Sequence, residues 1–266
     1  MGVLLAITMN TFREVVRQRL FLLILSLTVV GVAVMLAFPF FTIREETPMF
    51  KDLSVATVSL AMVFLVALTA SSAVAEELDS KTATTVLVKP VARWQFLLGK
   101  YAGVLLSLLV AMAVLSVVMF ITTYLRVYID ALPRDRQLAF TFSESQPARE
   151  FQALMLHHGL AMFPAAVMVL FQGAVLAAAA VVLSSRFSRV LAVLVTFGLF
   201  FVGHLADFIP LAVEQSPDAV RVAVGWLTGV LPFLETFNIA AVVVHLPLDP
   251  SSPVFGEVWA YVGLAG

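Results

Sequence analysis

Long apolar stretches alternate with short charged segments along most of the chain. A helix needs about 20 mostly apolar residues to cross a bilayer. Five stretches reach this length, and they cover residues 20–43, 53–75, 101–125, 153–183 and 190–209. The fourth is long enough to tilt or to project beyond the bilayer. The pattern predicts an all-α, polytopic membrane protein in which residues 1–266 form a single transmembrane domain.

The apolar pattern is interrupted towards the end of the chain. Residues 219–246 are apolar, but Gly229, Pro232 and Glu235 break the run. Proline removes a backbone donor and clashes with the preceding turn, so we expect two short re-entrant helices on the outer side, with one kinked span as the alternative. A final apolar run at 256–266 is too short to cross the bilayer. We interpret it as the start of a sixth span that is truncated.

The first 20 residues, which comprise a predicted elbow helix at 1–19 and Leu20, have separate apolar and polar helical faces. The apolar face carries Phe12, Val15, Val16 and Leu20, and the other face carries Asn10, Arg13, Glu14 and Arg17. This pattern predicts an elbow helix in the inner headgroup layer, with its basic residues towards lipid phosphate. We assign the membrane-surface contact to Phe12, Arg13 and Arg17. A plain cytoplasmic extension of the first span is the alternative.

Composition and charge support a membrane protein and orient it. The 266 residues are 61% hydrophobic and 12% charged, with a mean hydropathy of +1.03, whereas soluble domains are about a quarter charged. A net charge of −1 argues against a nucleic-acid partner. Lys and Arg are densest in 1–19, 76–100 and 184–189. By the positive-inside rule these segments and the N-terminus are cytoplasmic, and 126–152 is outside.

Motifs for catalysis are absent from the sequence. Gly99-Lys100 lacks the upstream glycine and the following Ser or Thr of a phosphate-binding loop, and neither HExxH nor GxSxG occurs. Ionisable residues are nearly absent from the predicted spans, which argues against a proton-coupled carrier. The chain has no cysteine, which excludes disulfides and thiolate metal sites. We expect no catalytic residue, cofactor or metal in this chain.

Two groups of histidines are the remaining candidates for chemistry. His157 and His158 have Met155 and Met162 nearby, a ligand set that would suit copper. His204 and Asp207 lie three residues apart near the end of the fifth span. We interpret both groups as polar residues near the interface or within a packed bundle.

Residues 76–100 form the most distinctive polar segment. Asp79 or Ser80 can cap a short helix that ends at Lys89-Pro90, and a second helix then runs into the third span. A short helix held below the membrane suits docking into a groove of a soluble partner, and an ordinary charged connector is the alternative. We predict that the docking residues are Glu76, Glu77, Asp79, Thr82, Val86, Leu87 and Val88.

Several of these stretches resemble a known family. The residues concerned are ITMNTFREVVRQRLF at 7–21, Lys51-Asp52-Leu53-Ser54, Glu76-Glu77-Leu78-Asp79, Thr82, Lys89-Pro90, Arg93, Phe96-Leu97-Leu98-Gly99-Lys100, Gly103, Leu231-Pro232 and Phe237-Asn238. They resemble permease subunits of ABC type-2 exporters, and most closely the branch related to maturation permeases of multicopper enzymes such as nitrous oxide reductase. The likeness is strongest over 7–21 and 76–103.

The resemblance implies a transport complex in the bacterial inner membrane. It implies six spans per permease, two permeases that are identical or close paralogues, and a separate ATPase on each that binds ATP and Mg. The implied mechanism is alternating access, in which closure of two ATPases is passed through the 76–100 loop to the permeases. A membrane enzyme using His204 and Asp207, and a non-catalytic scaffold or channel, are the other classes that the residues leave open.

Overall fold

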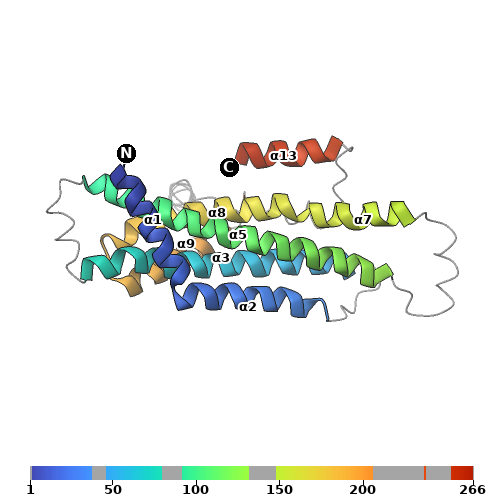
Figure 1. Cartoon of the computed structure of the whole chain (residues 1–266), viewed down its shortest axis with the longest axis horizontal. Coiled ribbons are helices and arrows are strands. Elements are labelled where there is room, and N and C mark those ends of the chain that lie inside the picture. Colours follow the sequence, from blue (N-terminus) through green and yellow to red (C-terminus); the bar gives the residue numbers. More distant parts are fainter. Residues whose placement is uncertain are drawn as a thin grey trace, which may run out of the picture. The chain divides into compact units, whose positions relative to one another are not determined.

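The computed structural model describes residues 2–37, 46–79, 92–131, 148–205, 237 and 253–265. In chain order its elements are α1 (Gly2–Arg17), α2 (Arg19–Met35), α3 (Glu46–Asp79), α5 (Arg93–Ala131), α7 (Ala148–Leu160), α8 (Met162–Ser184), α9 (Arg189–Leu205) and α13 (Pro253–Ala265) (Figure 1). Over these ranges the regular structure is helical and contains no strand. The all-α prediction is therefore confirmed for the described part of the chain.

Three long helices meet the requirements for crossing a bilayer. They run over Thr47–Ala73 in α3, Trp94–Ile129 in α5 and Gln152–Ser184 through α7 and α8. The bent pair α1 and α2, with 59° between them, qualifies as a fourth span, whereas α9 is apolar but shorter. The described residues thus give a multi-pass membrane protein with three or four candidate spans. The predicted re-entrant helices at 219–246 lie outside the described residues, except for Phe237.

The helices divide between two compact units. The first, here called the elbow unit, comprises Met1–Ile24, Ala61–Ala111 and Leu170–Phe237. The second comprises Leu25–Leu60, Met112–Val169 and Asn238–Gly266. The long helices α3, α5 and α8 each contribute one part to each unit.

Helix α3 is longer at both ends than the predicted span at 53–75. Pro48 lies in its first turn, where a missing backbone N–H costs no helical hydrogen bond. The buried Lys51 lies inside the helix rather than before it. At the other end no glycine or proline follows the apolar run, and the helix continues to Asp79. Glu76, Glu77 and Asp79 therefore belong to α3 and not to the start of a loop.

Helix α5 also begins before its predicted span at 101–125. It starts at Arg93, and its membrane-competent stretch begins at Trp94, so Lys100 lies within it. Lys51 in α3 and Lys100 in α5 are both buried near the beginning of such stretches, outside the spans predicted at 53–75 and 101–125.

The predicted span at 153–183 is interrupted between α7 and α8. Pro164 has no N–H to donate to the carbonyl of Leu160, and the helix breaks at Ala161. The N–H of Ala161 still donates to the carbonyl of His157 at 3.1 Å. The break is therefore local, and Gln152–Ser184 still qualifies as one span.

Small residues bring the helices of the elbow unit close together. Gly173 of α8 lies against Met62 of α3, and a Cβ at this glycine would be 2.8 Å from Met62 Cγ. Phe64 of α3 meets Phe197 of α9 edge to face, with ring centroids 4.9 Å apart. The Tyr101 hydroxyl of α5 donates to the Ala174 carbonyl of α8 at 3.2 Å. Close approach of backbones through small residues is the usual basis of helix packing in lipid.

The second unit has its own aromatic core. Phe120 of α5 packs against Gly159 of α7, where a Cβ would lie 2.8 Å from the ring, and against Phe163 of α8 at a centroid distance of 5.9 Å. Helix α13 includes the predicted run at 256–266 up to Ala265, and it buries Val258 and Val262, which lie one turn apart.

Candidate functional site

The elbow helix α1 is fixed against the first turns of α5 by two glycines. A Cβ at Gly103 would lie 2.7 Å from the Thr8 carbonyl oxygen and 2.6 Å from Thr11 Cβ. A Cβ at Gly99 would lie 2.8 Å from Ile7 Cγ2. Glycine lets the two backbones approach at a distance that other residues would prevent. Helix α1 lies obliquely across α5 at this point (Figure 1).

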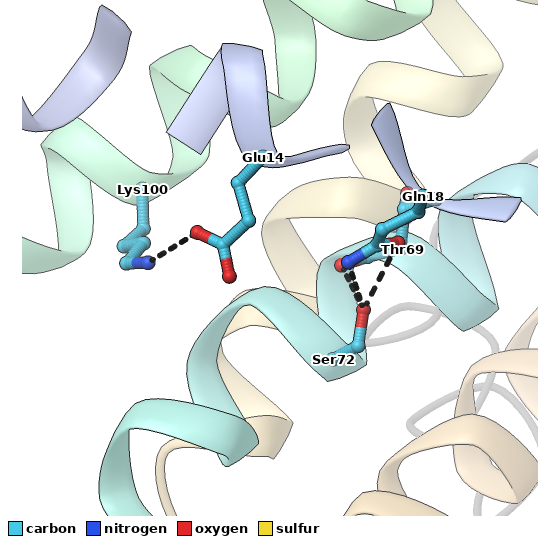
Figure 2. A network of polar contacts seen from close by, with 5 residues as sticks. All are labelled: Glu14, Gln18, Thr69, Ser72 and Lys100. Atoms are coloured by element: carbon cyan, nitrogen blue, oxygen red, sulfur yellow. Dashed lines mark hydrogen bonds and ion pairs between the residues drawn. The ribbon is translucent and has the colours of Figure 1, made fainter. Parts of the chain in front are cut away.

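An ion pair joins the same two helices. Glu14 Oε2 of α1 lies 3.6 Å from Lys100 Nζ of α5 (Figure 2). The lysine side chain is 1% exposed and the glutamate 32% exposed. Lys100 Nζ also lies 5.9 Å from the centre of the Phe96 ring. Removing an ammonium group from water is costly unless an opposite charge compensates, so Glu14 is needed where Lys100 is buried.

A hydrogen-bonded chain joins the end of α1 to α3. The side-chain amide of Gln18 donates to Ser72 Oγ at 3.1 Å, and the Ser72 hydroxyl donates to the Thr69 carbonyl at 3.0 Å (Figure 2). Gln18 is also the single residue between the end of α1 and the start of α2. Its N–H donates to the Val15 carbonyl, and its own carbonyl accepts from Leu22. One residue therefore connects α1, α2 and α3.

These contacts form one site, here called the elbow junction, which consists of Glu14, Gln18, Ser72, Gly99, Lys100 and Gly103. Glu14 lies in α1, and Gln18, four residues later, directly follows that helix. Ser72 lies seven residues, about two turns, before the end of α3 at Asp79. Lys100 lies the same distance after the start of α5 at Arg93. The C-terminal end of α1 and the residue after it thus contact both helices that border residues 80–92.

The predicted membrane-surface residues lie on α1 but are not part of the elbow junction. Arg13 and Arg17 are exposed, and Phe12 is half-buried. Among the other residues of the two predicted faces, Val15 is fully buried in the protein and Glu14 pairs with Lys100.

The predicted docking residues are not brought together by the described part of the structure. Glu76, Glu77 and Asp79 fall in the last turn of α3. Thr82, Val86, Leu87 and Val88, and the short helix predicted to contain them, lie outside the described residues.

His204 makes two polar contacts, whereas His158 Nδ1 is buried with no hydrogen-bond partner among the described residues. His204 Nδ1 lies 3.0 Å from the Phe200 carbonyl, which assigns the proton to Nδ1. His204 Nε2 then accepts from the Gln172 amide of α8 at 3.4 Å. Asp207 lies outside the described residues. Within the described ranges no three His, Cys, Asp or Glu side chains gather as metal ligands.

Sequence reasoning did not predict the pairing of Lys100 with Glu14 at the junction or the contact of Gln172 with His204. Lys100 was considered only in the phosphate-loop search, the charge count and the family resemblance, and Gln172 was not singled out. Each is a polar residue within an apolar helix, Lys100 in LLGKYAGVLL and Gln172 in VLFQGAVL. A search for isolated polar residues inside membrane-competent helices would have found both, because such residues face protein in preference to lipid.

The comparison with known families gives a match over most of the chain. Residues 5–252 match the family described as ABC-2 family transporter protein. The matched range contains the whole elbow junction and both helices that border residues 80–92. No curated protein matches the sequence.

Proposed function

Since the chain belongs to the ABC-2 family of transporter proteins, we propose that it is the membrane-spanning permease of an ATP-driven exporter. The match over 5–252 is the observation that carries this proposal, and the three long apolar helices agree with it. Two permeases pair in the bacterial inner membrane, each with its N-terminus in the cytoplasm. The likeness over 7–21 and 76–103 supports membership of the branch of multicopper-enzyme maturation permeases.

The energy for transport comes from a separate ATPase subunit on each permease. The sequence has no phosphate-binding loop of its own, so ATP and Mg bind to the partner. The docking contact is made by residues 79–88, between α3 and α5. Val86, Leu87 and Val88 supply the apolar part of this contact. Glu76, Glu77 and Asp79 meet basic residues of the ATPase and set its register.

Co-purification tests the proposal. The full chain is tagged, expressed together with a candidate ABC ATPase from the same genome, and purified in mild detergent. We expect the ATPase to remain bound in equal amount to the permease and to hydrolyse ATP with inhibition by vanadate. An elution profile that shows a folded permease with no ATPase, in several detergents and in lipid nanodiscs, would contradict the proposal.

A further inference from the structure

We propose that α1 is a clamp that holds the adjoining ends of α3 and α5 together, so that the three move as one body during transport. The body consists of α1, the last turns of α3 and the first turns of α5. This inference rests on the proposed function, because the ATPase that would move residues 80–92 belongs to that function. Glu14, Gln18 and Lys100 are then positioning residues for coupling.

The first support is that separate contacts reach both sides of residues 80–92. Glu14 pairs with Lys100 of α5 at 3.6 Å, and Gln18 donates to Ser72 of α3 at 3.1 Å (Figure 2). Glu14 lies in the last turn of α1, and Gln18 directly follows that helix. A force applied between Asp79 and Arg93 therefore reaches α1 through two side chains at once.

The second support is the close fit of α1 on α5. Gly99 and Gly103 are one turn apart, and each already faces α1 atoms at distances that leave no room for a Cβ. The buried Thr11 lies at the Gly103 contact, and the adjacent turn of α1 buries Val15. Surfaces that fit this closely tend to move together or separate in discrete steps, and they deform little.

The third support is the continuity from α1 into α2. Gln18 donates its N–H to Val15 in α1 and accepts the N–H of Leu22 in α2, so its backbone ends one helix and begins the next. Movement of the clamp is passed directly to the start of α2. Movement of residues 80–92 is thereby passed to α2, which lies far earlier in the sequence.

Distances between spin labels test whether the clamp moves as a unit. The chain contains no cysteine, so Asn10→Cys and Leu98→Cys add the only two labels, both at exposed positions on α1 and α5. The complex with its ATPase is reconstituted in liposomes and measured without nucleotide and after vanadate trapping. Labels on the two ATPases report in a parallel sample that trapping has closed them.

We expect the distance between positions 10 and 98 to change by less than about 2 Å on trapping, the size of ordinary helix shifts at interfaces. A change of about 5 Å or more, one helical turn, while the ATPases close would overturn the clamp and leave the proposed function standing. Failure of any ATPase to bind would contradict the proposed function instead. The junction would then still be tested in the permease without ATPase, by comparing the 10–98 distance between the wild type and the charge-reversal variants described below.

Charge reversal tests the role of the ion pair. Glu14→Lys places two ammonium groups at the junction, and we expect the 10–98 distance to broaden and to lengthen on trapping. The exchanged pair Glu14→Lys with Lys100→Glu should restore the wild-type distance. Asp52→Lys makes the same charge change at an exposed residue of the second unit, and it should have no effect. A wild-type distance in Glu14→Lys would overturn the role of the ion pair. If this variant does not fold, the 10–98 distance in the protein that keeps Glu14 and Lys100 decides the proposal.

Discussion

Replacing Gly103 with alanine should loosen α1 from α5. The added methyl would lie 2.7 Å from the Thr8 carbonyl oxygen and 2.6 Å from Thr11 Cβ. The carbonyl belongs to the α1 backbone and cannot rotate away, so the whole helix must move. Gly198 in α9 is a matched control, because a Cβ there meets nothing within 4 Å.

Two effects of opposite sign determine the size of the change. Overpacking a close contact costs about 1–3 kcal/mol, and alanine is a better helix former than glycine by about 1 kcal/mol. The higher helix propensity of alanine stabilises α5 itself, but it does not remove the clash between the added methyl group and α1. We therefore expect docking of α1 to weaken by about 1–3 kcal/mol in Gly103→Ala, a change of about 5–160-fold in the undocked population. Gly198→Ala should leave docking unchanged.

Limited trypsin digestion measures this population. Arg13 and Arg17 are exposed, but cleavage within a helix requires local opening of the chain. When opening and closing are fast, the rate of cleavage follows the open population. Cleavage after these arginines should accelerate about 5–160-fold in Gly103→Ala and remain at the wild-type rate in Gly198→Ala. Equal rates in the two variants would refute the reasoning from the glycine contact.

Three other outcomes are expected. Cysteines introduced at Ser80 and Ser143 should react with an impermeant maleimide from opposite sides of the membrane, and labelling from one side would end the topology model. Leu87→Asp should release the ATPase or leave it hydrolysing ATP without export, because a charge is costly in a buried contact; coupled transport would show that the contact lies elsewhere. Gln172→Ala should remove the bond to His204 and lower stability by about 0.6 kcal/mol, an average value for such bonds in lipid. An unchanged melting temperature in detergent would exclude this contribution.

The sequence predicts the existence of the long helices well because lipid imposes a length and a polarity on each of them. The core of α5 lies where its apolar run predicts. A helix that follows Lys89-Pro90 and runs into the third span was also predicted, and α5 starts at Arg93. The partner of Lys100 was not predicted, because Glu14 lies 86 residues away along the chain. No local pattern contains that pairing.

The choice of the buried face is harder to predict, and the reason is physical. In water the large apolar residues of a helix face the core, but lipid is as apolar as leucine and removes this preference. Helix α2 leaves Leu22, Leu23 and Leu27 exposed, while Ala70 and Ala73 of α3 are fully buried. A helical wheel that assigns the apolar side to the interior is therefore unreliable for helices such as α2.

The position of Lys100 also has a consequence for how the protein is made. A lysine in the middle of an inserting helix costs about 2.5–3.5 kcal/mol at the translocon, and less near the ends. Synthesis proceeds from the N-terminus, so the carboxylate of Glu14 has left the ribosome long before α5 emerges. If α1 has already settled at the membrane surface, the lysine meets its counter-ion as it arrives. Because α1 precedes α5 in the chain, the Glu14 carboxylate is synthesised before the Lys100 ammonium group that it will pair with.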